Sequence, residues 1–231
     1  MCGRYNVIDS PAVIGLLEGL GFDTSGMKPM EQPDMFNIAP TDEVLVAVKD
    51  EIAKVVREMR WWLTPGWAPE ISAKFTMFNA RAETVETSRA FSGPFRNRRA
   101  IVPASGYIEW SLVGGVKQPF YIRPESGYCF FAGLWDRWER DGNSLESCTI
   151  ITTEASPSTR FIHPRQPLFI TPDQFDLWLD ATADLSEIRP LLAPVELEGW
   201  VYYPVSKMVG NAGNKSGSLM QPIGEIKKLK D

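Results

Sequence analysis

The order of strand and helix patterns predicts an α+β fold with a mainly antiparallel sheet. Residues 43–49 and 53–59 are rich in alternating β-branched side chains and flank Lys49-Asp50-Glu51, which predicts a hairpin. Few helical patterns separate the strand patterns, which argues against a doubly wound sheet. The 231 residues contain no repeat, low-complexity tract or long linker, so we expect one domain.

The first half of the chain contains one clear helix signal. Ser10-Pro11 predicts an N-cap followed by a proline at the first helical position, and Gly19 and Gly21 predict the helix end. Residues 22–36 and 61–69 are rich in turn formers, so we expect loops there.

The rest of the chain alternates short strands with weaker helices. We expect a short helix at 84–91, a capped helix at 171–179 and a weaker one at 183–192. Strands are predicted at 100–102, 120–123, 128–135 and 147–153. We expect the domain to occupy 1–223 and a frayed, lysine-rich polar tail to occupy 224–231.

The composition, 44% apolar and 23% charged, is typical of a soluble globular protein. The sequence has no run of about 18 apolar residues and no apolar segment after its N-terminus, so we expect no membrane span and no secretory signal. Its cysteines are Cys2, Cys129 and Cys148, an odd number that argues against a disulfide framework and for the reducing cytoplasm.

The net charge of −5 argues against a protein that coats nucleic acid indiscriminately. Residues 81–99, however, hold five arginines and two acids, a local charge of +3. This segment is interpreted either as a solvated basic face or as a local nucleic-acid contact.

Cys2 is the sharpest chemical feature. Aminopeptidases generally remove an initiator methionine when the second residue is small, which would make Cys2 the N-terminus. Its amine then titrates at about 7.7–8.0 and its thiol near about 8.5, so both are partly nucleophilic at neutral pH. The amine condenses with an aldehyde and the thiol closes a thiazolidine ring, which no internal cysteine can do. An incidental second-position cysteine is the alternative.

Glu109 and His163 are the candidate acid/base residues. Glu109 lies between Ile108 and Trp110, where partial desolvation would raise its pKa, although an ordinary strand-edge glutamate would look the same. His163 is the sole histidine of the chain, so any imidazole chemistry must use it, although a lone histidine is more often structural. A multi-histidine metal site is excluded and the cysteines lack chelating spacing, so we expect no metal and no cofactor.

Two further groups could contact a polyanion. Asn79 and Arg81 share one face of an extended segment and could hold a phosphate or sugar oxygen. Trp61, Trp62 and Trp67 surround Pro65-Gly66 and could be either core residues or a stacking wedge for unpaired bases.

Together these residues resemble the SRAP family, the SOS response-associated peptidase-like proteins that sense abasic sites. The resemblance spans nearly the whole chain. It rests on blocks that occur in this order: Met1-Cys2-Gly3-Arg4-Tyr5, Phe36-Asn37-Ile38-Ala39-Pro40, Trp61 through Trp67, Phe78-Asn79-Ala80-Arg81-Ala82-Glu83-Thr84, Gly106-Tyr107-Ile108-Glu109-Trp110, Ile162-His163-Pro164-Arg165-Gln166-Pro167, Pro204-Val205-Ser206 and Val209-Gly210-Asn211. The chain departs from the family at Trp62, where glycine is usual, and at Pro164 and Gln166.

The resemblance implies an SRAP domain with a barrel-like β core and a few flanking helices. It implies that Cys2, freed by loss of Met1, forms a thiazolidine with a ring-opened abasic sugar, with possible lyase and self-reversal activity. Glu109 and His163 match acid/base residues and Asn37 matches an active-site asparagine. The DNA-binding residues expected from the motifs and the resemblance are Arg4, Asn79, Arg81, Arg89, Thr152, Arg165, Trp61 and Trp62.

The resemblance also implies a monomer that binds single-stranded DNA or junctions of single and double strand, cytoplasmic and associated with the nucleoid when DNA-bound. Three alternatives stay open. A thiol peptidase would use Cys2, Glu109 and His163. An N-terminal-nucleophile amidohydrolase would also start with Met-Cys-Gly, but it typically uses an Asn-Gly pair that this chain lacks. A non-catalytic single-strand binder would not need Cys2.

Overall fold

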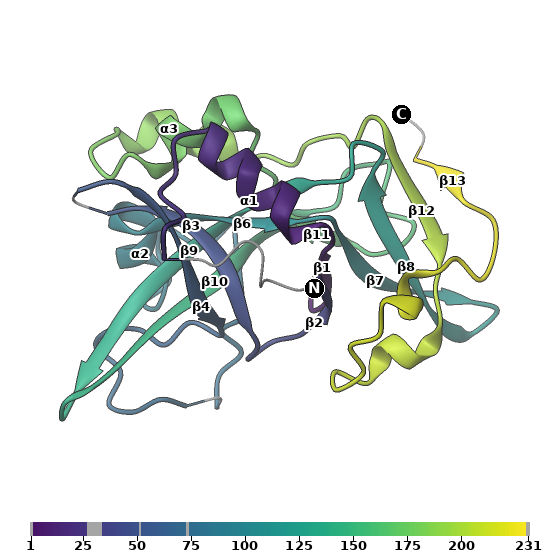
Figure 1. The fold of residues 1–231 in the computed structure, drawn as a ribbon, viewed down its shortest axis with the longest axis horizontal. Coiled ribbons are helices and arrows are strands. Elements are labelled where there is room, and N and C mark those ends of the chain that lie inside the picture. Colours follow the sequence, from purple (N-terminus) through teal and green to yellow (C-terminus); the bar gives the residue numbers. More distant parts are fainter. Residues whose placement is uncertain (1, 27–33, 51, 73, 230–231) are drawn as a thin grey trace.

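The predicted hairpin forms one wall of a closed β-barrel. The computed structural model describes residues 2–26, 34–50, 52–72 and 74–229. In it β3 (Glu43–Lys49) and β4 (Lys54–Trp61) pair antiparallel, as expected (Figure 1). The other barrel strands are β6 (Arg99–Ala104), β9 (Cys129–Arg140) and β10 (Asn143–Glu154). Because β10 pairs with both β9 and β4, the order β10-β4-β3-β6-β9 closes on itself.

A second sheet lies beside the barrel, on the right in Figure 1. Its strand order is β13-β12-β8-β7-β1-β2, with all neighbours antiparallel. The strands are β1 (Tyr5–Val7), β2 (Met35–Ile38), β7 (Gly106–Val113), β8 (Val116–Pro124), β12 (Trp200–Pro204) and β13 (Lys227–Lys228). The expected α+β class with a barrel core is confirmed, and the sheet is mainly antiparallel, since β10 runs parallel to β4 and to the short β5 (Asn79–Arg81).

The first helix is confirmed, but its cap is not the predicted one. Helix α1 (Ser10–Gly19) starts with proline in its first turn, as expected. Its N-cap is Asp9, whose carboxylate accepts the Ala12 N–H (3.4 Å), so the prediction of Ser10 as the cap is wrong. Gly21, with φ 84, follows the helix in a conformation that favours glycine.

The prediction of a short helix at 84–91 is wrong. That segment forms turns, and helix α2 (Ser92–Asn97) begins only after it. The Thr87 hydroxyl donates to the Thr84 carbonyl, a local side-chain bond of the kind that competes with helix formation.

The remaining helices are short. The helix predicted at 171–179 is a 3₁₀ turn, η1 (Pro172–Gln174), followed by α3 (Phe175–Leu179). The one predicted at 183–192 is α4 (Leu185–Ile188) followed by η2 (Arg189–Leu192). No helix in the described part of the chain is long and apolar enough to cross a membrane.

Two predicted irregular segments are partly regular. In the predicted loop 22–36, residues 27–33 lie outside the described residues, and Met35 already belongs to β2. The expected frayed tail is wrong for Lys227 and Lys228, which pair with β12. The tail therefore adds an edge strand to the second sheet.

The two faces of β7 meet different cores. Ile108 packs with Tyr121 and Tyr203 in a small cluster on one face. Tyr107 belongs to the main core, which fills the barrel and the space between barrel and sheet. Because side chains alternate along a strand, Glu109 lies on the same face as Tyr107, turned towards the main core.

Candidate active site

Strand pairing brings the N-terminal segment alongside Glu109. Tyr5 lies opposite Tyr107 in the antiparallel β1–β7 pair, and the Ile108 N–H donates to the Arg4 carbonyl (2.9 Å). Each step towards the N-terminus on one strand is a step towards the C-terminus on the other, so this register carries Cys2 to the level of Glu109 and Trp110.

The Cys2 thiol is fully buried, and its S–H points to the Arg4 carbonyl (3.9 Å). Burial raises the pKa of this thiol well above its ordinary value, and the nearby Glu109 carboxylate raises it further. At neutral pH the sulfur therefore holds its proton, and it needs a base before it can attack.

Glu109 is 3% exposed, and burial raises its pKa to about 7. A carboxyl with this pKa is present in both protonation states near neutral pH, as an acid/base group requires. The His163 Nδ1 lies 3.8 Å from its Oε1. Burial lowers the pKa of His163, so its imidazole is mostly neutral at pH 7. The two predicted acid/base residues therefore lie beside each other, and Glu109 is close enough to Cys2 to raise the pKa of its thiol.

The loop before β11 (Arg165–Pro167) positions His163. The Arg165 N–H donates to the His163 Nδ1 (3.1 Å). The buried Gln166 Oε1 accepts from the Ser156 N–H (3.0 Å) and the Thr159 hydroxyl (2.7 Å), which ties the loop to itself. Gln166 thus has a structural role that its sequence context did not reveal.

Asn37 is buried, with φ 50, in the left-handed region that asparagine tolerates better than most residues. Its Nδ2 donates to the carbonyls of Asn211 (3.0 Å) and Asn214 (2.9 Å), and Lys215 donates to its carbonyl (3.0 Å) and pairs with Asp42. The Asn37 Oδ1 has no hydrogen-bond partner among the described residues. A buried acceptor of this kind is available to a substrate or to an amine.

A second cluster of polar side chains lies at the C-terminal end of β10. Arg165 donates to the Thr152 hydroxyl (3.2 Å) and binds both oxygens of Glu83 (2.7 and 3.1 Å). Asn79 and Arg81 lie on β5 beside this end, with Arg81 opposite Thr152. The buried Asn79 Oδ1, like that of Asn37, lacks a partner among the described residues.

The other predicted DNA-binding arginines are less enclosed. Arg4 is half-buried and donates to the carbonyls of Gly3 (2.9 Å) and Gly210 (3.3 Å). Arg81 and Arg89 are exposed, and the Arg89 guanidinium lies 4.3 Å from the ring centre of Trp67. The basic segment 81–99 is not one free face, because Arg99 is 3% exposed and donates to the Phe95 carbonyl.

The prediction that Trp61 contacts DNA is wrong. Its ring is fully buried between Tyr5 and Phe78, and its indole N–H donates to the Phe78 carbonyl (2.8 Å). Trp62 is half-buried against Phe78 (5.5 Å between ring centres), so its stacking role stays a prediction. The exposed indole of this cluster belongs to Trp67, which is 54% exposed.

Replacing Trp61 with phenylalanine should lower the free energy of unfolding by about 2 kcal/mol, because it leaves a void and removes one of the two hydrogen bonds to the Phe78 carbonyl, which keeps the Ile150 N–H (3.1 Å). Trp67→Phe should change it by less than about 0.5 kcal/mol, as expected for an exposed site. Urea denaturation of both variants measures the difference. Equal stabilities would contradict the core assignment of Trp61.

Among the described residues, no group of three or more His, Cys, Asp or Glu side chains is arranged to hold a metal ion. The candidate site residues described above carry a thiol, a carboxyl, an imidazole and two carboxamides. Such groups can perform nucleophilic and acid/base chemistry on an anionic substrate.

The chain matches a protein family and several relatives along nearly its whole length. The model of the family described as SOS response associated peptidase (SRAP) matches residues 1–212. The chain is 33% identical over 224 residues to the abasic site processing protein YoaM of Bacillus subtilis, covering 95% of this chain and 97% of the relative. It is 31% identical over 228 residues to YedK of Escherichia coli, also called an abasic site processing protein, covering 96% and 100%.

A solved structure shares the fold. A crystal structure of a protein from Bacteroides thetaiotaomicron has a TM-score of 0.80 at 24% identity and covers 94% of this chain and 98% of its own. A second, from Bordetella bronchiseptica, has a TM-score of 0.73 at 23% identity, covering 89% and 100%.

Proposed function

This chain belongs to the SRAP family, and we propose that it processes abasic sites by forming a covalent bond between Cys2 and the aldehyde of the lesion. The observation that carries the proposal is that the buried Cys2 thiol lies near Glu109, which raises the pKa of the thiol, and that Glu109 in turn lies 3.8 Å from His163. Relatives named abasic site processing proteins match nearly the full length of the chain, which supports DNA as the substrate.

The proposed reaction joins two nucleophiles to one carbon. After Met1 is removed, the Cys2 amine attacks the aldehyde carbon of the ring-opened sugar. The carbinolamine hydroxyl takes a proton from Glu109 and leaves as water, which gives a protonated imine. The Cys2 sulfur then attacks the imine carbon as the thiol proton returns to the Glu109 carboxylate. The electron pair of the C=N bond moves to the nitrogen, so the thiazolidine closes as a neutral ring. The net change is loss of one water.

The pKa of Glu109 suits both proton transfers. A carboxyl that titrates near neutral pH can donate to the leaving hydroxyl and then accept the proton of the thiol. His163, neutral and 3.8 Å from Glu109, can relay a proton when the sugar ring opens. The free Asn37 Oδ1 can orient the amine, since a buried acceptor gains from a donor.

The DNA backbone is the proposed partner of the surrounding cations. The Arg4 carbonyl contacts the Cys2 thiol, Arg81 lies opposite Thr152, and the exposed Arg89 lies over the Trp67 ring. We propose these three guanidinium groups as phosphate contacts, because arginine pairs well with phosphate. A missing base leaves room at the lesion, so little base flipping is required. Single strands and junctions are the proposed substrates.

A gel with denaturant tests the proposal. The protein is incubated with single-stranded DNA that carries one abasic site, without any reducing agent, and its N-terminal mass is checked for loss of Met1. We expect a heat-stable shifted band with abasic DNA and none with undamaged DNA. No band from a protein with a free Cys2 amine would contradict the proposal, and hydrolysis of glutamine or of a foreign peptide would then favour the amidohydrolase or peptidase alternatives.

A further inference from the structure

The sheet face that holds Glu109 continues beyond the active site. Glu109 lies opposite Phe120 on β8, and Tyr202 on β12 lies opposite both Ile122 of β8 and Lys227 of β13. Directly opposed residues, and residues two apart on one strand, share a face. A single face therefore runs from Glu109 past Phe120 and Tyr202 to Lys227, across three strand spacings or about 14 Å.

Phe161 stands over this face. Its ring is 58% exposed and packs edge-on against Tyr202 (5.2 Å between ring centres), which in turn packs against Phe120 (6.0 Å). The Ser111 hydroxyl donates to the Phe161 carbonyl (3.3 Å), which ties the loop to β7. Phe161 thus links the loop of His163 to the face that leads away from the site.

The surface is hollowed on both sides of Phe161. One hollow of about 280 Å³ is lined by Phe120, Ile162 and Pro204 among others, and a second of about 840 Å³ by Pro157 and Ser158. The two hollows share four lining residues: Phe161, Tyr202, Glu225 and Lys227. They form one groove, which we call the Phe161 groove.

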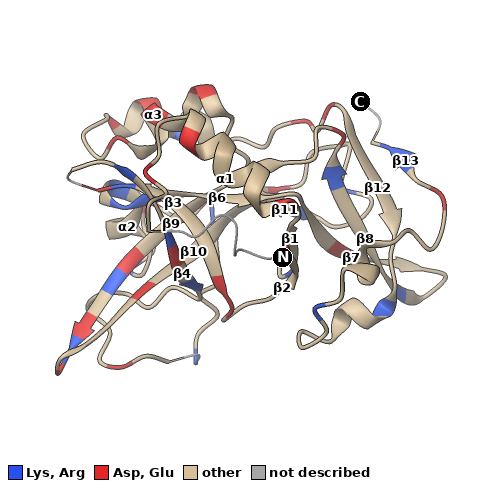
Figure 2. Cartoon of the chain, in the orientation of Figure 1, with Lys and Arg blue, Asp and Glu red and all other residues tan. Residues whose placement is uncertain are grey.

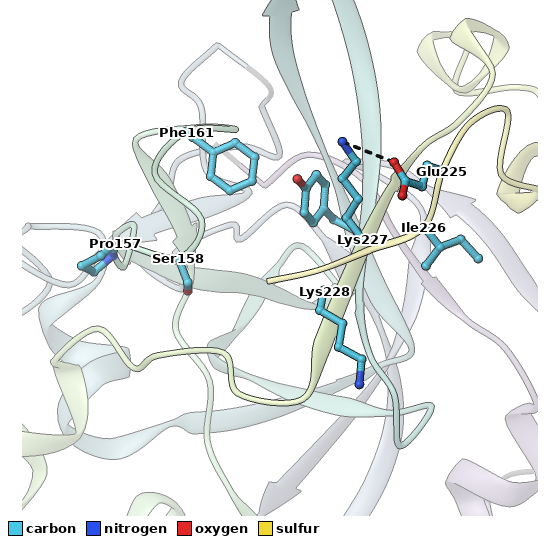
Figure 3. A pocket seen from close by; sticks show the side chains of 8 residues that line it. Pro157, Ser158, Phe161, Glu225, Ile226, Lys227 and Lys228 are labelled. Carbon is cyan, nitrogen blue, oxygen red and sulfur yellow. Dashed lines mark ion pairs between the residues drawn. The ribbon is translucent and has the colours of Figure 1, made fainter. Parts of the chain in front are cut away.

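The groove combines an aromatic wall with a cation. Figure 3 shows Phe161 on one side and Lys227 on the other, with the Lys227 amine paired to Glu225 (3.6 Å). Lys228 points away from Lys227 and pairs with Glu125 (3.1 Å). Both partners of the Lys227–Glu225 pair are more than half exposed, so the pair is weak and a phosphate can replace the carboxylate.

We propose that the Phe161 groove binds the single-stranded nucleotides that flank the lesion on one side, with a base against the Phe161 ring and a phosphate at the Lys227 amine. The inference rests on the proposed function, because the strand is placed by a lesion held at Cys2. Base stacking on an exposed ring tolerates any sequence, and a nearby lysine follows the backbone, which together suit a protein that acts wherever an abasic site arises.

The test uses DNA that cannot react. Oligonucleotides with a tetrahydrofuran abasic analogue lack the aldehyde, so anisotropy reports binding alone. Their single-stranded flanks are lengthened on the 5′ side or on the 3′ side in turn. For wild type we expect affinity to rise with length on one side. Phe161→Ala should lose about tenfold of that gain, while binding of the shortest oligonucleotide and its crosslinking yield in the aldehyde form stay unchanged.

Two variants, one that removes a positive charge and one that removes a negative charge, test the phosphate contact. Lys227→Ala should weaken binding of the long oligonucleotide and lower the salt slope by about 0.7, as for one phosphate contact on a single strand. Glu225→Ala should strengthen binding, because it frees the lysine. Tyr128→Ala removes another exposed aromatic ring, which does not line the groove, and serves as the matched control.

Two results would overturn the inference. Equal affinity of Phe161→Ala and wild type at every length would show that no nucleotide occupies the groove. An equal loss with short and long oligonucleotides would show that Phe161 acts through the His163 loop. Failure of the proposed function would give a different result, because wild type would bind the analogue but would form no crosslink with the aldehyde-bearing DNA.

Discussion

Cys2→Ala should leave no heat-stable crosslink to abasic single-stranded DNA, a loss of at least about a thousandfold in rate. Alanine retains an amine that can form an imine but has no sulfur to close the ring. Affinity for the non-reactive analogue should stay within about twofold, because the thiol is fully buried against the Arg4 carbonyl and is not exposed at the protein surface. A denaturing gel with a time course measures the loss.

Cys148→Ala is the matched control, since it removes a different fully buried thiol. It should crosslink like wild type. Cys2→Ser separates the two nucleophiles: its imine should appear as a band only when borohydride is added. A heat-stable, reductant-independent band from Cys2→Ala would show that another residue forms the bond.

Glu109→Gln should slow crosslinking by about 10²–10⁴-fold, the range typical of a lost acid/base group. Glutamine fills the same space but cannot exchange a proton with the carbinolamine or the thiol. Single-turnover rates measured from pH 5 to 9 test this role. A variant that keeps the wild-type pH profile, merely scaled down, would point to a positioning role instead.

The same substitution should stabilise the protein, and more so at high pH. The pKa of Glu109 is about 7 when folded and about 4.5 in its ordinary state, so between these pH values the folded chain retains a proton that the unfolded chain has lost. The free energy of unfolding of wild type therefore falls as pH rises from about 4.5 to 7. Glu109→Gln removes this loss, and at pH 8 it should be more stable by about 3 kcal/mol.

Urea denaturation at pH 5 and pH 8 measures this difference. The gain in stability should be small at pH 5 and reach its full size above pH 7. Glu198→Gln, at an exposed position, is the control and should show no such trend. A gain that is the same at both pH values would mean that desolvation of the carboxylate does not destabilise the native state.

Three neighbouring tryptophans differ in their burial, and the sequence does not predict that difference. Trp61, Trp62 and Trp67 have the same chemistry and lie within seven positions, yet one is fully buried, one half-buried and one 54% exposed. Trp61 ends β4, inside the closed barrel, whereas Trp67 follows a turn at which the Gly66 N–H binds Asp136 (2.9 Å). No local pattern encodes this difference, because it depends on which strands close the barrel.

The sequence also does not show which arginines are free to bind a ligand. The arginines of residues 81–99 suggested a basic face, but Arg98 pairs with Asp136 (2.9 Å) and Arg99 is buried. Figure 2 shows both signs of charge interspersed along the β9–β10 hairpin. Partners that lie far away along the chain decide whether a cation is available to a ligand.

By itself, the sequence determined the α+β class, the hairpin of β3 and β4 and the proline-started helix α1, because these depend on local periodicity and capping. It also singled out Cys2, Glu109 and His163 as candidate site residues from their chemistry. Tertiary structure alone decided the rest: the closure of the barrel by β10, the burial that raises the pKa of Glu109 to about 7, the clamp of Asn211, Asn214 and Lys215 on Asn37, and the groove beside Phe161. Each of these joins residues separated by tens to nearly two hundred positions, and desolvation and register arise only when such residues are packed together.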